Sequence, residues 1–430
     1  MRLAVQRLNK TPPGKRRFLF LQGPISPFFA EVAAGLRGLG HEVFRINLNL
    51  GDRLFWRGPG GVDFTAKPDA WRPWIEAFLD QQAISDLVLL GEQRFYHQEA
   101  IAAAKARGLA ITVTEWGYLR PDWIILERDG TGGESLFPRD PATILHKAEG
   151  LPAPDLRRCF ADHFPSQAFW DIAYHAALLF PAPFRHFRNH EVVHPLATYA
   201  GIGRRLLLRP MEDRRSTRIL ADLLGRRVAF WVFAMQIEND FSLRAYSSYR
   251  GMDAALQKAM ASFAAHAPSD GELLIKLHPL DPCVKNWPTR IAAMARKLGL
   301  GGRVHVAPRG DLDAMLQAAR GMIAVNSTAA SRALALNKPV KLLGQSVFNI
   351  PGLVFQGALD AFWTKAEAPD AALRDAFFAL LCAAFMVRGV YFAREGRSAA
   401  VRATVERLDR GLINLPLPAP LPETRGACWP

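Results

Sequence analysis

Short apolar strands alternate with amphipathic helices in two separate stretches of this 430-residue chain, and this alternation limits the possible folds more than any other feature. The first stretch predicts strands at 17–22, 42–47, 86–90 and 110–114. The second predicts strands at 227–233, 272–277, 304–306, 321–325 and 339–343. Because strands separated by helices usually pair in parallel, each stretch predicts a doubly wound, Rossmann-like α/β domain.

The alternation also predicts the domain boundaries. We expect a first domain at 15–215 and a second at 226–360, since the pattern begins afresh after a basic, polar stretch at 212–227 that is typical of a linker. The helices predicted within 361–415 should pack back on the first domain. The proline-rich tail, 416–430, should be loose.

The composition is that of a globular protein, with 50% hydrophobic and 22% charged residues. The longest apolar run, 376–387, is far shorter than the ~20 residues that a helix needs to span a bilayer, and it predicts a buried helix. The basic N-terminus has no apolar segment followed by a cleavage site, which favours a cytoplasmic protein. The four cysteines lie far apart and indicate neither a zinc site nor a disulfide framework.

The formal net charge of +14 would attract nucleic acid, anionic lipid or phosphorylated substrates. The basic residues are scattered, and neither an RNA-recognition aromatic motif nor a zinc finger accompanies them, so we expect no nucleic-acid partner. The segments 184–188 and 204–209 combine apolar and cationic side chains, as a peripheral membrane surface would. Core packing with solvated charge explains them equally well.

Ligands of open α/β sheets bind at the carboxyl ends of the strands, so polar residues directly after strands are candidate site residues. In the first domain, Gln22 and Gly23 follow the first strand, where a glycine lets a ligand approach the backbone. Glu115 and Arg120 follow the strand at 110–114. Glu115 could act as a base or nucleophile, whereas a salt bridge that closes the loop is the structural alternative.

In the second domain, Gln236 and Asp240 lie in a loop after the first strand, where amide and carboxylate groups suit sugar hydroxyls. An Asx turn at 239–240 would be the structural alternative. Lys276 and His278 follow the next strand and, at alternate positions, should point the same way. Both suit a phosphate, and His278 could be a general acid for a leaving phosphate.

Asn326, Ser327 and Thr328 separate an apolar strand from a helix of small residues. Asn326 or Ser327 could cap that helix, whose free N–H groups bind phosphate, and the hydroxyls of Ser327 and Thr328 would add contacts. Capping alone explains one polar residue but not three in succession. Together with Lys276 and His278, these residues predict a nucleotide-phosphate site within the second domain.

Six ordered motifs carry a resemblance to the capsule polysaccharide biosynthesis family, and within it to the β-Kdo transferases that act on a lipid acceptor. The motifs are QGP, EWGYLRPDWI, MQIENDFSLRAYSSY, IKLHP, VNSTAASRAL and KPVKLLG, and they span roughly residues 17 to 355. The resemblance implies a GT-B-like fold with two Rossmann-like domains facing across a cleft. It further implies retaining transfer of Kdo from CMP-Kdo to a phosphatidylglycerol-type lipid.

The resemblance implies no metal and no cofactor apart from CMP-Kdo as donor substrate. From their chemistry at the strand ends, we expect Glu115, Arg120 and His278 to act in catalysis. The lipid acceptor implies work at the inner face of the inner membrane, with other capsule-assembly proteins as partners. One departure matters: related Kdo transferases often carry two adjacent acids, but Trp116 occupies the second position here. Trp116 favours one alternative, a noncatalytic capsule-assembly protein. The other alternative is a glycosyltransferase that uses another nucleotide sugar on the same scaffold.

Overall fold

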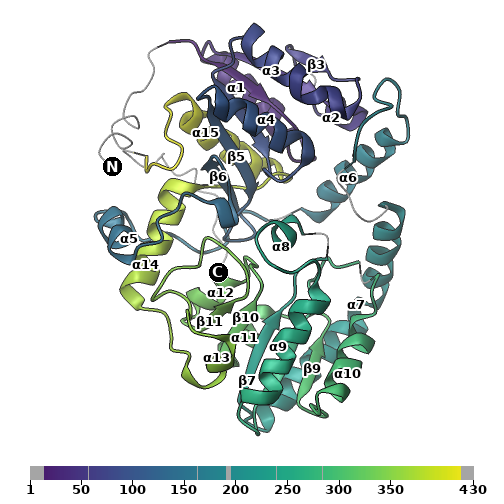
Figure 1. Cartoon of the computed structure of the whole chain (residues 1–430), viewed down its shortest axis with the longest axis vertical. Helices are drawn as coiled ribbons and strands as arrows, with labels where there is room; N and C mark the ends of the chain where they lie inside the picture. Colours follow the sequence, from purple (N-terminus) through teal and green to yellow (C-terminus); the bar gives the residue numbers. More distant parts are fainter. Residues whose placement is uncertain are drawn as a thin grey trace. The chain divides into compact units, whose positions relative to one another are not determined.

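The computed structural model describes residues 14–417 except 57, 162, 190–194, 239 and 283. The chain forms two compact units (Figure 1). The first consists of residues 1–137, 151–190 and 379–430, and the second of residues 138–150 and 191–378. The chain therefore passes between the units more than once, which a sequence that shows one switch near residue 220 does not reveal.

The first unit is built on a seven-stranded sheet in the order β12-β6-β5-β4-β1-β2-β3. Its strands are β1 (Arg17–Phe20), β2 (Glu42–Asn47), β3 (Gly61–Asp63), β4 (Asp86–Leu90), β5 (Ala110–Trp116), β6 (Trp123–Arg128) and β12 (Met386–Arg388). Its helices are α1 (Phe28–Gly38), α2 (Leu50–Leu54), α3 (Trp71–Gln81), α4 (Phe95–Ala106), α6 (Phe164–Leu178) and α15 (Arg394–Asp409), with 3-10 turns at Pro68–Ala70 and Gly132–Glu134.

Strand alternation divides the core of this unit into two layers. Phe18 and Phe20 of β1 point to the face covered by α1 and α15, whereas Leu19 and Leu21 point to the face covered by α3 and α4. Both faces of the central strands are therefore apolar, as parallel sheets buried between two helical layers require. This packing explains why these strands appear in the sequence as continuous apolar runs.

The edge of the sheet differs from the prediction. β5 continues to Trp116 and turns back as β6, which pairs with it antiparallel, and β12 adds a further antiparallel strand. The predicted loop after residue 114 is therefore a hairpin. The apolar run at 376–387 is not one helix: α14 (Ala371–Leu380) gives way to a π-helical turn (Leu381–Phe385) and then to β12.

The second unit is built on a fully parallel sheet in the order β11-β10-β7-β8-β9. Its strands are β7 (Phe230–Ala234), β8 (Glu272–Lys276), β9 (Val304–Ala307), β10 (Gly321–Ala324) and β11 (Val340–Leu342). Its helices are α5 (Pro141–Ala148), α7 (Pro195–Gly225), α8 (Phe241–Ala245), α9 (Met252–His266), α10 (Trp287–Lys297), α11 (Leu312–Ala318), α12 (Ala330–Ala335), α13 (Leu359–Lys365) and most of α14.

One face of this sheet packs on α9, α10 and α13, with Trp231, Phe263 and Trp363 in mutual edge-to-face contact at the centre. The predicted linker at 212–227 lies almost entirely inside the 31-residue helix α7, which packs against β9. Its basic residues are typical of a solvated helix face. Of the C-terminal helices expected on the first domain, α15 packs there against α1, whereas α13 belongs to the second unit.

The predicted α/β class with two Rossmann-like units is confirmed. In the part of the chain that the structure describes, no helix is both long and apolar enough to cross a bilayer. The cysteines depart from expectation, because Cys159 is disulfide-bonded, whereas Cys382 is a free, buried thiol. The tail beyond residue 417 lies outside the described residues.

Candidate functional sites

The first candidate site lies at the carboxyl ends of β1, β4 and β5, and its most unusual group is the carboxyl of Glu115. The residue as a whole is half-buried, yet its carboxyl group is enclosed, and this desolvation raises the pKa to about 7. The backbone N–H of Trp116 donates to Oε1 at 2.9 Å and favours the ionised form. A carboxyl that titrates near neutrality can exchange protons during a reaction.

The charged neighbours of Glu115 come partly from a loop that the sequence reading did not single out. Arg94 and Arg120 lower the pKa of Glu115, and Glu92 raises it. Gly91, at φ +65°, is so close that a Cβ atom there would lie 3.0 Å from Oε2 of Glu115. Gly91, Glu92 and Arg94 directly follow β4, so the same strand-end rule would have found them.

Arg94 is the more informative of these residues. It occupies the N-cap position of α4, and its charge acts on Glu115, Asp52 and His97. Its guanidinium has neither a hydrogen bond nor an ion pair among the described residues. His97 is fully buried, and this burial lowers its pKa to about 3, so its imidazole is neutral. Arg94 is therefore a cation available to an anionic ligand at this sheet edge.

The hairpin between β5 and β6 explains the direction in which the Trp116 side chain points. Strand alternation turns its indole away from the Glu115 side, toward Tyr391 and Phe392, with ring centroids 5.1 and 5.6 Å apart. Arg120 is exposed and lies over the Trp116 ring at 5.8 Å. The salt bridge in this segment joins Asp122 to Arg388 at 3.2 Å, so the Glu115 carboxyl is not part of it.

Gln22 and Gly23 lie beside a small pocket at the end of β1. Gln22 is buried and donates to Asp52 at 3.2 Å and to the Tyr174 hydroxyl at 3.3 Å. Gly23 lines the pocket, and packing explains its lack of a side chain because a Cβ atom would clash with the ring of Phe29.

A buried ion pair forms the polar floor of this pocket. Arg45 and Asp52 lie 3.2 Å apart and both line the cavity, together with Tyr174 from α6. Burial raises the pKa of Asp52, while Arg45 and hydrogen bonds from Leu48 and Gln22 oppose the shift. Neither residue was predicted, because Arg45 lies within a strand and Asp52 within a short helix, away from the strand ends.

In the second unit, Gln236, Asp240 and Asn326 bond mainly to one another. The Gln236 amide donates to Asn326 Oδ1 at 2.7 Å and to Asp240 at 3.3 Å, and its oxygen accepts from the Asn326 backbone at 3.0 Å. Asp240 caps α8 through Ser242 at 2.9 Å. These side chains tie the loops after β7 and β10 together, and their predicted role in binding substrate stays a prediction.

Ser327 and Thr328 lie between this network and α12. The cap position of α12 belongs to Ala329, so neither Asn326 nor Ser327 caps the helix as expected. Ser327 Oγ instead accepts from the Ala329 backbone at 3.2 Å. The Thr328 hydroxyl has no hydrogen-bond partner among the described residues, which leaves it available to a ligand.

Lys276 and His278 have different surroundings, although alternate strand positions would place them on the same side. β8 ends at Lys276, so His278 lies in the loop beyond the strand. The Lys276 amine is buried and donates to the Leu277 carbonyl at 2.9 Å; burial, then the nearby Arg205 and Arg309, lower its pKa to about 8. His278 is half-buried, and its Nδ1 accepts from the Leu280 backbone at 3.1 Å.

Arg205 is a structural residue of this site that the sequence reading missed. Its buried guanidinium donates from α7 to the carbonyls of His278, Asp281 and Pro308 at 2.6–3.1 Å, and it pairs with Glu212 at 3.2 Å. It thus holds the loops after β8 and β9 at the edge where Lys276 lies. Only the fold reveals this role, because residue 205 is far in sequence from the loops it joins.

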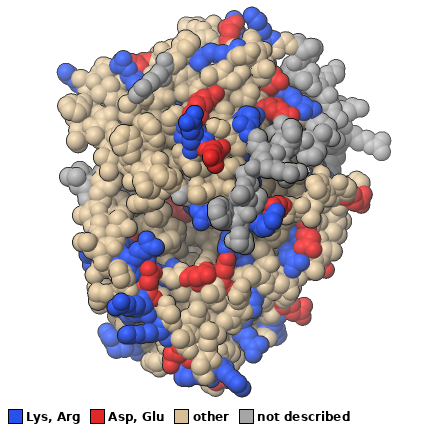
Figure 2. Space-filling view, turned by 180° about the vertical axis from the view of Figure 1, so that it is seen from behind, with Lys and Arg blue, Asp and Glu red and all other residues tan. Residues whose placement is uncertain are grey.

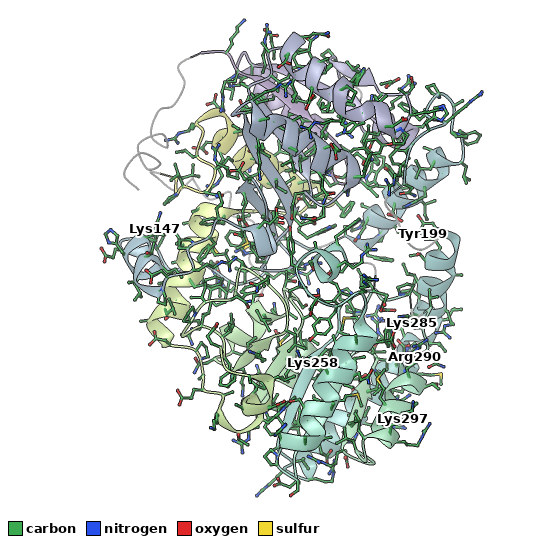
Figure 3. All side chains as sticks on the ribbon, viewed as in Figure 1. Lys147, Tyr199, Lys258, Lys285, Arg290 and Lys297 are labelled. Carbon is green, nitrogen blue, oxygen red and sulfur yellow. The ribbon has the colours of Figure 1, made fainter. Side chains whose placement is uncertain are left out.

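Many of the basic side chains are neutralised locally. Figure 2 shows lysine and arginine side chains interspersed with aspartate and glutamate on the face that it draws. In the second unit, Lys285 and Arg290, labelled in Figure 3, both pair with Asp253, at 2.5 and 2.9 Å. Across the described ranges, no cluster of three or more metal-ligating side chains is present.

Comparison with known proteins gives one family match and several relatives. Residues 85–392 match the family described as capsule polysaccharide biosynthesis protein. The capsule polysaccharide export protein KpsS of Escherichia coli is 29% identical over 381 residues, which cover 88% of this chain and 97% of the relative. The capsule polysaccharide modification protein LipB of Neisseria meningitidis serogroup A is 29% identical over 372 residues, which cover 84% and 87%.

Solved structures with lower similarity include the β-Kdo 2,7 transferase of Thermosulfurimonas dismutans KpsC. It is 12% identical, with a TM-score of 0.44, and the match covers 90% of this chain and all of that one. The UDP complex of Staphylococcus aureus MnaA is also 12% identical, with a TM-score of 0.30, over 92% of this chain and 97% of that one.

Proposed function

Because this chain belongs to the capsule polysaccharide biosynthesis protein family, we propose that it is a glycosyltransferase that moves Kdo from CMP-Kdo to a phosphatidylglycerol-type lipid. The observation that carries the proposal is the enclosed carboxyl of Glu115, whose pKa is about 7, at the carboxyl end of an α/β sheet. The donor and acceptor follow from the resemblance of the six motifs to lipid-acceptor β-Kdo transferases.

In this proposal the second unit binds the nucleotide phosphate. Below pH 8 the Lys276 ammonium neutralises phosphate charge, and the hydroxyls of Ser327 and Thr328 add hydrogen bonds. His278 donates to the departing phosphate. Gln236, Asp240 and Asn326 keep the surrounding loops in place and present their remaining polar surface to the nucleotide or sugar.

The first unit supplies the reacting carboxylate. In one route, Glu115 attacks the anomeric carbon as CMP leaves; the acceptor oxygen then displaces Glu115 and loses its proton to solvent, so that two inversions give retention. In the other route, Glu115 takes the proton of the acceptor hydroxyl while the acceptor oxygen attacks the anomeric carbon and CMP leaves, and this single displacement gives inversion. Arg94 and Arg120 pair with the Kdo carboxylate in either route, since both cations act on Glu115. Mass spectrometry of the intact protein with CMP-Kdo alone separates the routes, because only the first adds a Kdo residue to the chain.

The proposal is tested by incubating the protein with CMP-Kdo, generated in place, and a fluorescent phosphatidylglycerol analogue. We expect product from the wild type and almost none from Glu115→Gln or His278→Ala. CMP-sialic acid and UDP-sugars serve as competing donors. Turnover of one of these in place of CMP-Kdo would contradict the donor assignment and favour a glycosyltransferase that uses another nucleotide sugar.

A noncatalytic role in capsule assembly is the second candidate, and Trp116 favours it. The indole occupies the position where related transferases often carry an acid, and it packs toward the core. Under this alternative, Glu115→Gln would leave capsule production in cells intact. We propose that the protein works in either case in the cytoplasm at the inner face of the inner membrane, with other capsule-assembly proteins as partners.

A further inference from the structure

Helix α6 of the first unit exposes a row of large apolar side chains. Phe169 is 62% exposed and Ile172 is 56% exposed, and in the turn that follows the helix Leu179 is 78% and Phe180 69% exposed. Phe169 and Ile172 are three residues apart and so lie on the same side of α6, and Leu179 and Phe180 follow at its C-terminal end. We call these four exposed side chains the α6 face. Large exposed apolar patches usually mark an interaction site.

The opposite side of α6 explains why this face stays outward. Trp170 and Tyr174 pack on Phe55, with ring centroids 5.3 and 6.4 Å away. The Tyr174 hydroxyl also accepts from Asn49 Nδ2 at 2.9 Å, deep within the unit. The helix is therefore fixed by its aromatic inner side, and the α6 face is free of the core of its own unit.

The α6 face is directly connected to the candidate site. Tyr174 lines the pocket of Gly23, Arg45 and Asp52, and its hydroxyl accepts from Gln22 at 3.3 Å. Whatever binds the α6 face is thus held by the same helix that lines the pocket through Tyr174. A lipid acceptor drawn from a bilayer would be delivered there without leaving the membrane surface.

We propose that the α6 face docks on an anionic phospholipid bilayer, with Phe169, Ile172, Leu179 and Phe180 inserted at the level of the headgroups. Charge complementarity favours this occupant over a second copy of the chain: Arg158 before the helix and Arg185 after it are exposed, and the chain carries a net charge of +14. Apolar residues flanked by arginine characterise helices that lie in the membrane interface. The inference rests on the proposed function insofar as the acceptor is a lipid.

The test is co-flotation of the full-length protein with vesicles of phosphatidylcholine and phosphatidylglycerol in equal amounts, and with vesicles of phosphatidylcholine alone. The wild type should float with the mixed vesicles and much less with the neutral ones. The variant F169S/I172S/L179S/F180S should bind the mixed vesicles at least about tenfold more weakly, because it loses most of the inserted apolar area.

Leu39→Ser is the matched control, because Leu39 is 55% exposed in the same unit but stands alone at the end of α1. It should bind vesicles as the wild type does, and all three proteins should unfold at similar temperatures. Equal flotation of wild type and quadruple variant would overturn the proposal. The proposal would also be overturned if the wild type did not float with the mixed vesicles. It would be overturned as well if light scattering showed that the wild type is a dimer and the quadruple variant a monomer, with no change in vesicle binding.

A second measurement separates this inference from the proposed function. Transfer to a monomeric, short-chain phosphatidylglycerol should proceed equally in the wild type and the quadruple variant, since the α6 face does not touch the reacting groups. Vesicle binding without any transfer would refute the proposed function but would support membrane docking by the α6 face. Transfer to the short-chain acceptor without vesicle binding would refute membrane docking by the α6 face and leave the proposed function supported.

Discussion

The two candidate sites satisfy their polar side chains in opposite ways. In the second unit, the side chains of Gln236, Asp240 and Asn326 form hydrogen bonds mainly with one another and with the adjacent α8. In the first unit, the Glu115 carboxyl is desolvated and accepts one backbone hydrogen bond, while the Arg94 guanidinium lacks a partner within the described chain. A closed network costs little to bury, whereas a desolvated carboxyl and an unpaired cation cost free energy unless a ligand uses them.

This contrast separates residues that hold a site from residues that act in it. All of them lie at or shortly after the carboxyl ends of strands, so their positions in the sequence look alike. Substitutions at these residues should therefore differ in whether they lower activity or stability.

Glu115→Gln should have the largest effect. The amide keeps the shape of the side chain but cannot accept a proton or attack as a carboxylate, so kcat should fall by about 10²–10⁴. The free energy of unfolding should not fall, because the variant removes a desolvated acid. Glu42→Gln, in an exposed ion pair with Arg17, is the control and should keep full activity. Equal losses in both variants would mean that the effect is not specific to the site.

Asn326→Ala should mainly destabilise the fold. The change removes the acceptor of Gln236 and leaves the Ser242 carbonyl without its 2.7 Å donor, so the free energy of unfolding should drop by about 2–3 kcal/mol. Ser327→Ala should cost less than about 1 kcal/mol, because it removes one local bond. Chemical denaturation measures both. An unchanged denaturation midpoint for Asn326→Ala would contradict the structural role assigned to the second-unit network.

Lys276→Met should weaken donor binding. In the wild type, the amine loses its charge as pH rises through about 8, so KM for the donor should increase above that pH. The variant should show a KM raised about tenfold at pH 7 and no rise near pH 8. Lys297→Met, an exposed lysine on α10, should behave as wild type. A KM rise near pH 8 that persists in Lys276→Met would assign that titration to another group.

Thr328→Val should have the smallest effect. Its hydroxyl has no partner among the described residues, so its loss should leave stability nearly unchanged. One lost hydrogen bond to the nucleotide should raise KM for the donor by about fivefold with little change in kcat. Steady-state kinetics at a fixed acceptor concentration measures this. A variant that unfolds early but binds donor normally would place Thr328 among the structural residues.

The sequence predicted the strands well because burial between helical layers makes them apolar. The strands at 42–47 and 86–90 were predicted to the residue. The hairpin at β6 was missed, since a strand paired antiparallel at a sheet edge breaks the alternation with helices. The helix α7 was missed where its surface is charged, because a solvated helix and a polar linker share one composition.

The strand-end rule found Glu115 and the phosphate-side residues but not Arg45, Asp52 or Arg205. Arg45 and Asp52 form a buried pair between a strand and a short helix, and Arg205 joins loops far from it in sequence. Such pairings depend on tertiary packing that local patterns do not encode. The pKa of Glu115 could not be predicted either, because it depends on how fully the surrounding loops exclude water.

The most direct measurement is the pH dependence of kcat/KM for Kdo transfer from CMP-Kdo, in the wild type and in Glu115→Gln. A carboxyl that must be ionised to act gives a rate that rises with pH up to its pKa and then levels off. The wild type should therefore show an acidic limb near pH 7, and the residual activity of the variant should lack that limb. A limb near pH 7 that survives in Glu115→Gln, or a variant with full activity, would show that this carboxyl is not the catalytic group.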